Sequence, residues 1–480
     1  MSFIVVKAVS LVFLLSCPLE AAVENIYYWK SVTYEDQPLA DETYIGPYQY
    51  NIPENNDVIG LSLHKKSGLM LVGMGRLRPG IPSTLNAFCI TDYETGTSPH
   101  VWGFPNYEMN TLKASFYGDA QTGRRKFVKR DMIYSSGFYK HLFGDYRREV
   151  ASFGGQRLPA KKSFSSDDFS IISVVHPEVD NLCNRLYAVD SGILQYSATE
   201  IYEVQLPAII VFELPSNGCE SRQFPVIRRV EIPKRYWTTA AGFNFITIDY
   251  GSKKSSCDDV FLYITNAFDS SILVYDYQKD CFSSVTDPSM RPIIAESTMV
   301  FHDTSMDLNY QLPLGVCNVA LGWPDKNGNR NAYYAPGSSL GEYLVSTKIL
   351  KNFEPPQRYL FNLTSEFMLL GYRGCNSQAY KQIFDEKTGI IFFAEMQSNR
   401  VSCWNAQKPI NPDNIGVVYE ADTLQFVSEI FLDSKGYLWF HSSHVPIDFL
   451  TNDPLDISNV VSRTFRVKVS EAVQGTVCGF

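Results

Sequence analysis

The 480-residue sequence has no long hydrophobic run after its N-terminus and no excess of positive charge. Lys7 precedes the apolar run AVSLVFLLSC, and Ala21 and Ala22 follow it, as in a cleaved secretory signal peptide. This run is too short to span a bilayer, and no later segment approaches about 20 uninterrupted apolar residues. We therefore expect residues 1–22 to be removed from a secreted, extracellular chain without a membrane partner. The formal net charge of −9 excludes a general nucleic-acid partner, because phosphate binding requires a basic face.

The sequence also lacks the common motifs of hydrolytic, metal and phosphate chemistry. It contains no G-x-S-x-G elbow, no H-E-x-x-H pair, no glycine-rich phosphate loop and no C-x-x-C pair. His441 and His444 supply too few ligands for zinc, so we expect no metal and no cofactor. His64 and His176 end first strands of the repeats described below, where a hydrogen-bonded structural histidine accounts for them. The catalytic residues of any activity remain unknown at this point.

Helical apolar periodicity is scarce as well, and a repeated strand pattern takes its place. Six segments begin at Val58, Ser170, Asn244, Gly315, Asn376 and Leu424. Each contains an alternating strand, a turn rich in Asp, Lys, Asn or Gly, and a second strand that is more apolar. A third strand follows in every unit, and a fourth is recognisable in units one and two.

Six such units predict an all-β fold, a six-bladed β-propeller, with residues 23–480 as a single domain. The sixth unit has no convincing fourth strand after Val469. The mature N-terminus offers NIYYWKSVTYE, which has no local partner. We therefore expect the N-terminal strand to complete the sixth blade and close the ring.

The ends of the second strands suggest a ligand site. In a propeller the first strands line the central channel, and the second strands here end at small or polar residues. A protonated amine would meet Asp190 or Glu395 while its ring packs on Phe393. The candidate ligand residues are Asp190, Asn266, Asn376, Ser377, Gln378, Phe393 and Glu395. The alternative is ordinary turn polarity around a water-filled channel.

The cysteines favour an oxidising compartment, since nine of the ten follow the leader. Cys183 and Cys257 fall in turns between first and second strands, and Cys219 and Cys281 follow third strands. These turns share one end of a blade, so we predict disulfides within blades, joining Cys183 to Cys219 and Cys257 to Cys281. The pairing of the others stays open: Cys89, Cys317, Cys375, Cys403 and Cys478. Asn362 begins the only acceptable glycosylation sequon.

Several ordered blocks carry a family resemblance. They read GRLRPGIPSTL, RLYAVDSG, PAIIVFEL, YYAPGSSLGEYLVST, RGCNSQ, GIIFFAEMQSNRVSCWN and GYLWFHSSHVP. Over residues 28–469 the chain resembles the insect Yellow and major royal jelly protein family. The resemblance implies a secreted six-bladed propeller. It also implies a choice of roles: pigmentation and hardening of cuticle or eggshell, dopachrome conversion, binding of biogenic amines, or nutrition.

Residues 107–168 depart from this family, whose members have a shorter link between the first two blades. The insertion is basic in an acidic protein and is interleaved with tyrosine and phenylalanine. One interpretation is a solvated loop. The other is a docking surface for an acidic partner or for extracellular matrix components of cuticle or eggshell.

Two functions of different classes remain open. The first is a non-enzymatic propeller that binds a small aromatic amine or catechol in its channel, or serves as a structural component of cuticle or eggshell. The second is an isomerase or tautomerase that acts on dopachrome in the melanin pathway, which requires a positioned proton-transfer residue.

Overall fold

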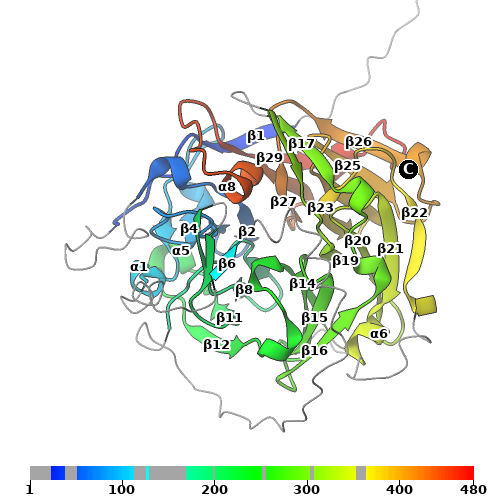
Figure 1. Ribbon diagram of the computed structural model, residues 1–480, viewed down its shortest axis with the longest axis horizontal. Coiled ribbons are helices and arrows are strands. Elements are labelled where there is room, and N and C mark those ends of the chain that lie inside the picture. The colour runs from blue at the N-terminus through cyan, green and yellow to red at the C-terminus, as the bar shows by residue number, and fades with distance from the viewer. Residues whose placement is uncertain are drawn as a thin grey trace, which may run out of the picture.

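A computed structural model places six four-stranded antiparallel sheets in a ring around a central channel (Figure 1). The structure describes residues 23–37, 51–112, 126–128, 169–197, 200–250, 256–302, 307–352 and 364–479. The leader and Asn362 lie outside these ranges, as does most of the insertion. The predicted six-bladed β-propeller is confirmed.

From the channel outward, the strands of each blade follow chain order, except that the N-terminal strand β1 is the outermost strand of blade six. Blades one and two comprise β2 (Gly60–His64), β3 (Leu69–Gly73), β4 (Leu85–Cys89) and β5 (Trp102–Gly103), then β7 (Glu178–Asp180), β8 (Arg185–Asp190), β11 (Ala208–Glu213) and β12 (Val226–Glu231). Blades three and four comprise β13 (Phe243–Tyr250), β14 (Val260–Asn266), β15 (Ser271–Asp276) and β16 (Cys281–Thr286), then β19 (Val316–Pro324), β20 (Arg330–Pro336), β21 (Gly341–Ser346) and β22 (Met368–Tyr372). Blades five and six comprise β23 (Ala379–Asp385), β24 (Ile390–Glu395), β25 (Arg400–Asn405) and β26 (Ile415–Glu420), then β27 (Val427–Leu432), β28 (Tyr437–Ser442), β29 (Ser462–Lys468) and β1 (Glu24–Trp29).

Burial explains why the second strands are the most apolar. Every residue of β3 and of β24 is buried, because both faces of these strands pack against neighbouring blades. The turns that precede them need a left-handed backbone, which glycine adopts without a steric cost. Gly68 has a φ of 72° and Gly389 a φ of 73°. Alternating apolar strands and glycine turns therefore encode the blades directly.

The N-terminal strand closes the ring as predicted. β1 pairs antiparallel with β29, so that Tyr28 lies opposite Arg463 and Trp29 opposite Ser462. Ile26, Tyr27 and Trp29 are buried. In Figure 1 the dark blue β1 lies beside the orange-red β29. The N-terminal strand β1 thus completes the last blade.

Additional elements decorate the ring. They are the sheet β6 (Lys126–Val128), β10 (Glu200–Glu203) and β9 (Ile193–Ser197), the ribbon β17 (Thr298–His302) and β18 (Asp307–Gln311), and the helices α1 (Tyr107–Asn110), α5 (Gly218–Ser221), α6 (Thr347–Lys351), α8 (Val445–Leu450) and α9 (Val469–Ala472). Short 3-10 helices cover Pro53–Asn55, Ile90–Asp92, Lys234–Tyr236, Ala240–Gly242, Pro288–Met290, Ile294–Glu296, Thr364–Glu366 and Pro412–Asn414.

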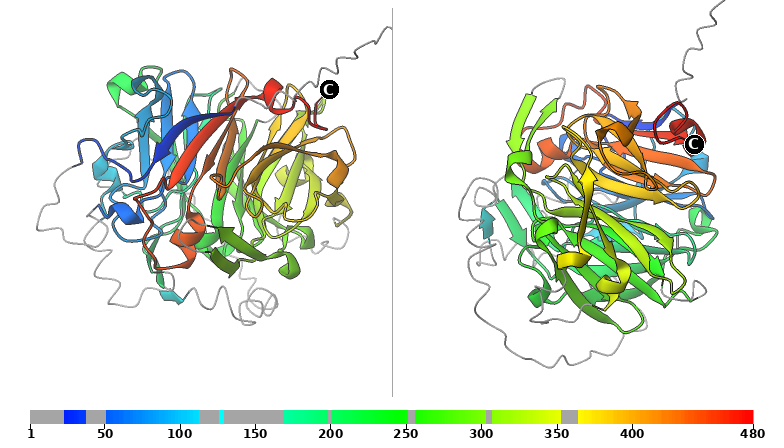
Figure 2. Two further views of the ribbon diagram at one scale, coloured as in Figure 1. Left: turned by 90° about the horizontal axis from the view of Figure 1, so that it is seen from above. Right: turned by 90° about the vertical axis from the view of Figure 1, so that its right-hand side faces the viewer.

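The β17–β18 ribbon and α8 lie on one face of the ring, and the C-terminus lies towards the other (Figure 2). Within the described part of the chain, no helix has the length and apolar character needed to cross a membrane.

The disulfides correct the predicted pairing. Cys183 joins Cys257, and Cys219 joins Cys89, while Cys281 is free and exposed. The third disulfide joins Cys403 of β25 to Cys478 near the C-terminus. Each of the first two bonds connects neighbouring blades rather than parts of one blade. The prediction was wrong because equivalent turns of adjacent blades lie side by side around the ring, at the channel end where the inner strands finish.

Candidate ligand pocket at the channel mouth

A pocket lies at the channel end where the inner strands begin, opposite the turns joined by Cys183 and Cys257. It holds about 690 Å³ of empty space, part of it open to solvent. Most of its wall comes from residues at or just before the start of inner strands, and the rest comes from loops and α8. The lining residues are Ile59, Leu77, Val175, Ala241, Gly242, Phe243, Asn244, Ala267, Phe268, Leu312, Leu314, Tyr380, Phe426, Val445, Pro446, Phe449 and Leu450.

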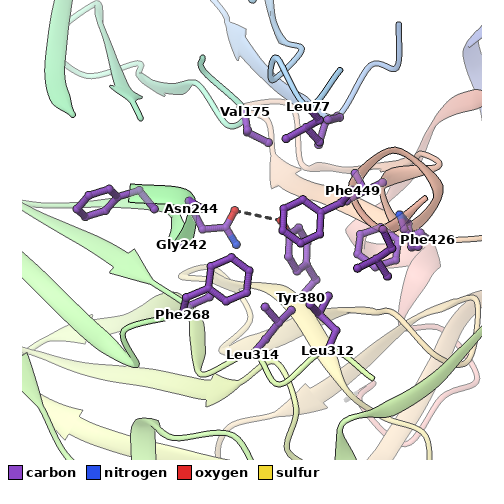
Figure 3. Close-up of a pocket in the computed structure, with 17 residues that line it drawn as sticks. Leu77, Val175, Gly242, Asn244, Phe268, Leu312, Leu314, Tyr380, Phe426 and Phe449 are labelled. Carbon is purple, nitrogen blue, oxygen red and sulfur yellow. Dashed lines mark hydrogen bonds between the residues drawn. The ribbon is translucent and has the colours of Figure 1, made fainter. Parts of the chain in front are cut away.

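The pocket is aromatic with one polar edge. Figure 3 shows Phe268, Tyr380, Phe426 and Phe449 grouped around the hollow. The hydroxyl of Tyr380 donates a hydrogen bond to Oδ1 of Asn244 over 3.1 Å. Burial raises the pKa of Tyr380, so this hydroxyl stays protonated. Such a pocket suits a flat apolar ring that carries a small number of polar groups.

Below the pocket, the channel holds a cluster of titratable side chains. Nζ of Lys381 on β23 contacts the carboxylate of Glu429 on β27 and lies 3.8 Å from that of Glu178 on β7. Burial alone would lower the pKa of Lys381, but the charges of Glu429 and Glu178 raise it above its usual value. Burial also favours protonated Glu429, yet Lys381 and His176 hold the pKa of Glu429 below its usual range. Lys381 and Glu429 therefore form an ion pair.

Glu178 and His176 differ in their titration: the pKa of Glu178 is raised and that of His176 is lowered. Loss of solvation raises the pKa of Glu178 to about 7, although its side chain remains 31% exposed. Burial lowers the pKa of His176, so its imidazole is neutral. Its Nδ1 lies 3.0 Å from Oε2 of Glu429, and a carboxylate only accepts, so Nδ1 carries the proton. Among the described residues no group bonds Nε2, which is buried and carries an unshared electron pair.

Aromatic contacts connect the cluster with the pocket. The His176 ring packs on Phe245 at 3.9 Å between centroids and lies 5.8 Å from the ring of Tyr380. Tyr380 lines the pocket, and Lys381 is the next residue on β23. The titratable cluster of Lys381, Glu429, Glu178 and His176 therefore lies directly below the aromatic side chains of the pocket.

Comparisons with known proteins identify the family of this chain and several relatives. A family model described as "Major royal jelly protein" matches residues 172–478. The chain belongs to the major royal jelly protein family. "Yellow-related salivary protein ASP4" of Phlebotomus orientalis is 35% identical over 332 residues, which cover 67% of this chain and 77% of that protein. "Yellow-related salivary protein LJM11" of Lutzomyia longipalpis is 32% identical over 330 residues, which cover 68% and 78%. The resemblance drawn from the sequence blocks is confirmed.

Two of the sequence blocks that carry the family resemblance contain a buried arginine. Each of these arginines forms hydrogen bonds within the propeller. Arg373, from RGCNSQ, is buried, donates to the carbonyls of Gly341 and Ser339, and pairs with Glu342 at 2.7 Å. Arg76, from GRLRPG, is also buried and donates to several backbone carbonyls, including that of Ile171 at 2.9 Å. Both arginines bind backbone oxygens and are not exposed to a ligand.

The two candidate carboxylates at strand ends, Asp190 and Glu395, already form hydrogen bonds or an ion pair with nearby groups of the protein. Asp190 is buried and accepts hydrogen bonds from the backbone N–H groups of Ile172, Ser173 and Gly192 and from the Gln205 amide. Glu395 accepts from the hydroxyls of Ser398 and Ser402 and pairs with Arg400. Neither carboxylate lines the pocket.

The other candidates also lie outside the pocket lining. The Asn266 amide bonds the Thr239 carbonyl and the Asp269 carboxylate, and Phe393 is buried within the hydrophobic core. Ser377 donates to the Gly374 carbonyl, Gln378 donates to the Glu296 carbonyl, and Asn376 is exposed. The structure therefore does not bring the seven candidates together in one cavity, and their ligand role stays a prediction.

The other histidines singled out in the sequence, His441, His444 and His64, have structural partners. His441 lies between the Thr464 hydroxyl and the Val58 carbonyl, and burial lowers its pKa to about 4. His444 bonds the Val461 carbonyl, and His64 lies between Ser67 and Asn184. No group of three or more metal-ligating side chains occurs among the described residues.

Little in the amino-acid sequence indicates the pocket itself. Phe243 and Tyr380 lie at the start of inner strands and Phe426 lies just before one, and an aromatic residue at such a position cannot be told from a core residue. One signal was present: Lys381 and Glu429 are oppositely charged residues in the middle of two first strands, and opposite charges at such positions indicate a paired site in the channel.

Proposed function

We propose that this family member is a secreted propeller that binds a small aromatic molecule, such as a catechol or an indoleamine, in the channel-mouth pocket. The observation that carries the proposal is the aromatic lining with the Tyr380–Asn244 hydrogen bond at its edge. An apolar wall supplies affinity for a ring, and the amide and hydroxyl orient its polar substituents. The relatives' description as salivary proteins supports secretion, as does the signal peptide that the sequence predicts.

Isothermal calorimetry with a panel of catechols and indoleamines tests this proposal. Asn244→Ala should weaken binding by about 1–3 kcal/mol, because it removes a polar group that orients the ligand in a partly buried site. The matched control is Asn376→Gly, which removes an exposed amide and still accommodates the φ of 59° at that position.

The two variants separate the pocket from the candidate site drawn from the sequence. Weaker binding only in Asn376→Gly would favour the strand-end residues. If the wild type gives no heat with any ligand of the panel, the binding proposal fails. A structural role in cuticle or eggshell, with matrix contacts through residues 107–168, then becomes the better proposal.

The channel cluster favours a second candidate function, dopachrome conversion. Tautomerisation needs a base and an acid, and Nε2 of His176, oriented through Nδ1 by Glu429, has the arrangement of a general base. Glu178, with a pKa of about 7, can exchange a proton near neutrality. Loss of the visible absorbance of dopachrome measures this activity. His176→Gln should lower the rate by about a hundredfold or more, whereas Glu420→Gln on an exposed edge should leave it unchanged.

A further inference from the structure

The wall of the channel-mouth pocket has no side chain that is charged at neutral pH. None of the described lining residues is Asp, Glu, Lys, Arg or His. The polar side chains of the wall are the Asn244 amide and the Tyr380 hydroxyl. Burial raises the pKa of Tyr380, so its hydroxyl stays neutral as well. A ligand in this pocket therefore contacts apolar side chains and two neutral polar groups.

Two carboxylates adjoin lining phenylalanines in the sequence, and both already have partners within the protein. The carboxylate of Asp269 accepts hydrogen bonds from the backbone and hydroxyl of Thr238 and from the Asn266 amide. Oδ1 of Asp448 lies 3.4 Å from Nε of Arg78. Neither Asp269 nor Asp448 belongs to the lining of the pocket. Neither carboxylate therefore provides the wall with a counter-ion for a bound cation.

Deeper in the channel, a series of ring contacts leads from the wall to the titratable cluster. The ring of Tyr380 lies 5.2 Å from that of Phe426 and 5.3 Å from that of Phe245, between centroids. Phe245 packs in turn on His176 at 3.9 Å, and His176 contacts the carboxylate of Glu429. A lysine already neutralises this carboxylate. Glu429 thus lies beyond a layer of aromatic side chains, and no member of the cluster lines the pocket.

These surroundings determine the charge that a bound ligand can carry. An ammonium group that leaves water without a counter-ion loses hydration that apolar side chains do not replace. An aromatic face attracts a cation, but for a primary ammonium this attraction is the smaller effect. A neutral ring loses little hydration and gains contact with the phenylalanine side chains. The wall therefore favours neutral ligands over protonated amines.

The polar edge of the pocket indicates which neutral group a ligand presents. Oδ1 of Asn244 accepts a hydrogen bond from the Tyr380 hydroxyl over 3.1 Å. Among the described residues Tyr380 is the one hydrogen-bond partner of the Asn244 side chain, and Figure 3 shows this amide at the edge of the hollow. An amide NH₂ group only donates hydrogen bonds. It is therefore matched by an oxygen acceptor on the ligand, such as a carbonyl or hydroxyl oxygen.

From this geometry we propose that the pocket selects neutral ring compounds that carry an oxygen acceptor, and that it excludes protonated amines. Asn244 binds the oxygen, and the lack of a carboxylate in the wall excludes the cation. Neutral phenols, catechols, aromatic alcohols and aromatic ketones fit this description, whereas a protonated indoleamine does not. The inference rests on the proposed function, because it concerns the ligand of the same pocket.

Tryptophol and tryptamine test the charge preference, because they differ only in a hydroxyl or an amino group on the same side chain. At about pH 7 the amine of tryptamine is protonated. Isothermal calorimetry should show tryptamine binding at least about tenfold more weakly than tryptophol. N-acetyltryptamine keeps the nitrogen without its charge and should bind like tryptophol. Indole with a plain ethyl side chain lacks the oxygen, and it should bind more weakly than tryptophol in the wild type but not in Asn244→Ala.

A charge introduced into the wall should reverse the preference. Leu312 lines the pocket and is partly exposed, so a polar side chain can be accommodated there. Leu312→Glu supplies a counter-ion and should strengthen the binding of tryptamine, relative to tryptophol, by about tenfold or more. Leu312→Gln is the matched control, because it has nearly the same shape without the charge. It should leave tryptophol as the tighter ligand.

The outcomes distinguish this inference from the proposed function. If no compound of the series binds, the ligand pocket and the inference fail together. If wild-type protein binds tryptamine as tightly as tryptophol or more tightly, the pocket stands and the charge preference is overturned. This comparison needs no variant, so it holds even where a substitution prevents folding. An equal change of tryptamine binding in Leu312→Glu and Leu312→Gln would also overturn the charge preference.

Discussion

At the scale of single residues, a polar side chain at a strand end can either bind a ligand or form hydrogen bonds with the backbone. The number of nearby hydrogen-bond donors distinguishes these two roles. Asp190 meets three backbone N–H groups and one amide, so its acceptor capacity is used within the fold. The sequence shows that the position is acidic but not which N–H groups approach it, because those of Ile172 and Ser173 come from a segment 17 or more residues earlier. The residue type was therefore predictable and its role was not.

A substitution at Asp190 measures this structural role. Asp190→Asn places an NH₂ group against backbone donors in a buried site, and we expect the free energy of unfolding to fall by about 2–4 kcal/mol. Chemical denaturation followed by tryptophan fluorescence measures the change.

An exposed aspartate provides the comparison for Asp190. Asp422→Asn should change the free energy of unfolding by less than about 0.5 kcal/mol. Equal stability of the two variants, with ligand affinity lost only in Asp190→Asn, would instead assign Asp190 to ligand binding.

At the scale of elements, strands were predictable where apolar alternation and turn residues agree. β24 shows both features, since IIFFAE follows a glycine turn and is entirely buried. The outer strands β16 and β22 were not recognised, because CFSSVT and MLLGY face solvent in part and lack a regular alternation. The disulfides depend on which turns are neighbours in space, and the sequence order of the strands within one blade does not reveal the neighbours in the next.

The pairing between blades gives a direct chemical prediction. Peptide mapping without reduction should find Cys183 joined to Cys257 and Cys89 joined to Cys219, with Cys281 labelled by an alkylating reagent in the folded protein. Cys257→Ser should lower the free energy of unfolding by about 2–4 kcal/mol, because it releases a loop between residues 74 positions apart.

Cys281→Ser is the matched control, since this thiol is free and exposed. It should leave the unfolding transition unchanged. A peptide that links Cys257 to Cys281 would restore the pairing within blades that the sequence suggested.

At the scale of the whole molecule, the six repeats and the unpaired N-terminal segment were enough to predict a closed ring. Repeats specify a propeller because each blade can bury its faces only against its neighbours. They do not specify the pocket, which is assembled from residues at the inner strands of several blades, from loops and from α8. Its walls depend on side-chain directions and on loops that the repeat pattern does not describe.

Ring closure provides the last prediction, because it pairs the N-terminal strand β1 with β29, the third strand of blade six. Removing residues 23–34 deletes β1 and the buried side chains Ile26, Tyr27 and Trp29, and it leaves β29 as an open edge. Replacement of one such aromatic side chain by alanine costs about 3–5 kcal/mol, and the whole domain is stable by about 5–15 kcal/mol. The shortened chain should therefore fail to unfold cooperatively in calorimetry and should aggregate. Trp29→Ala is the milder variant and should still fold with a lower melting temperature. A soluble shortened chain with the wild-type transition would show that β1 does not close the ring in solution.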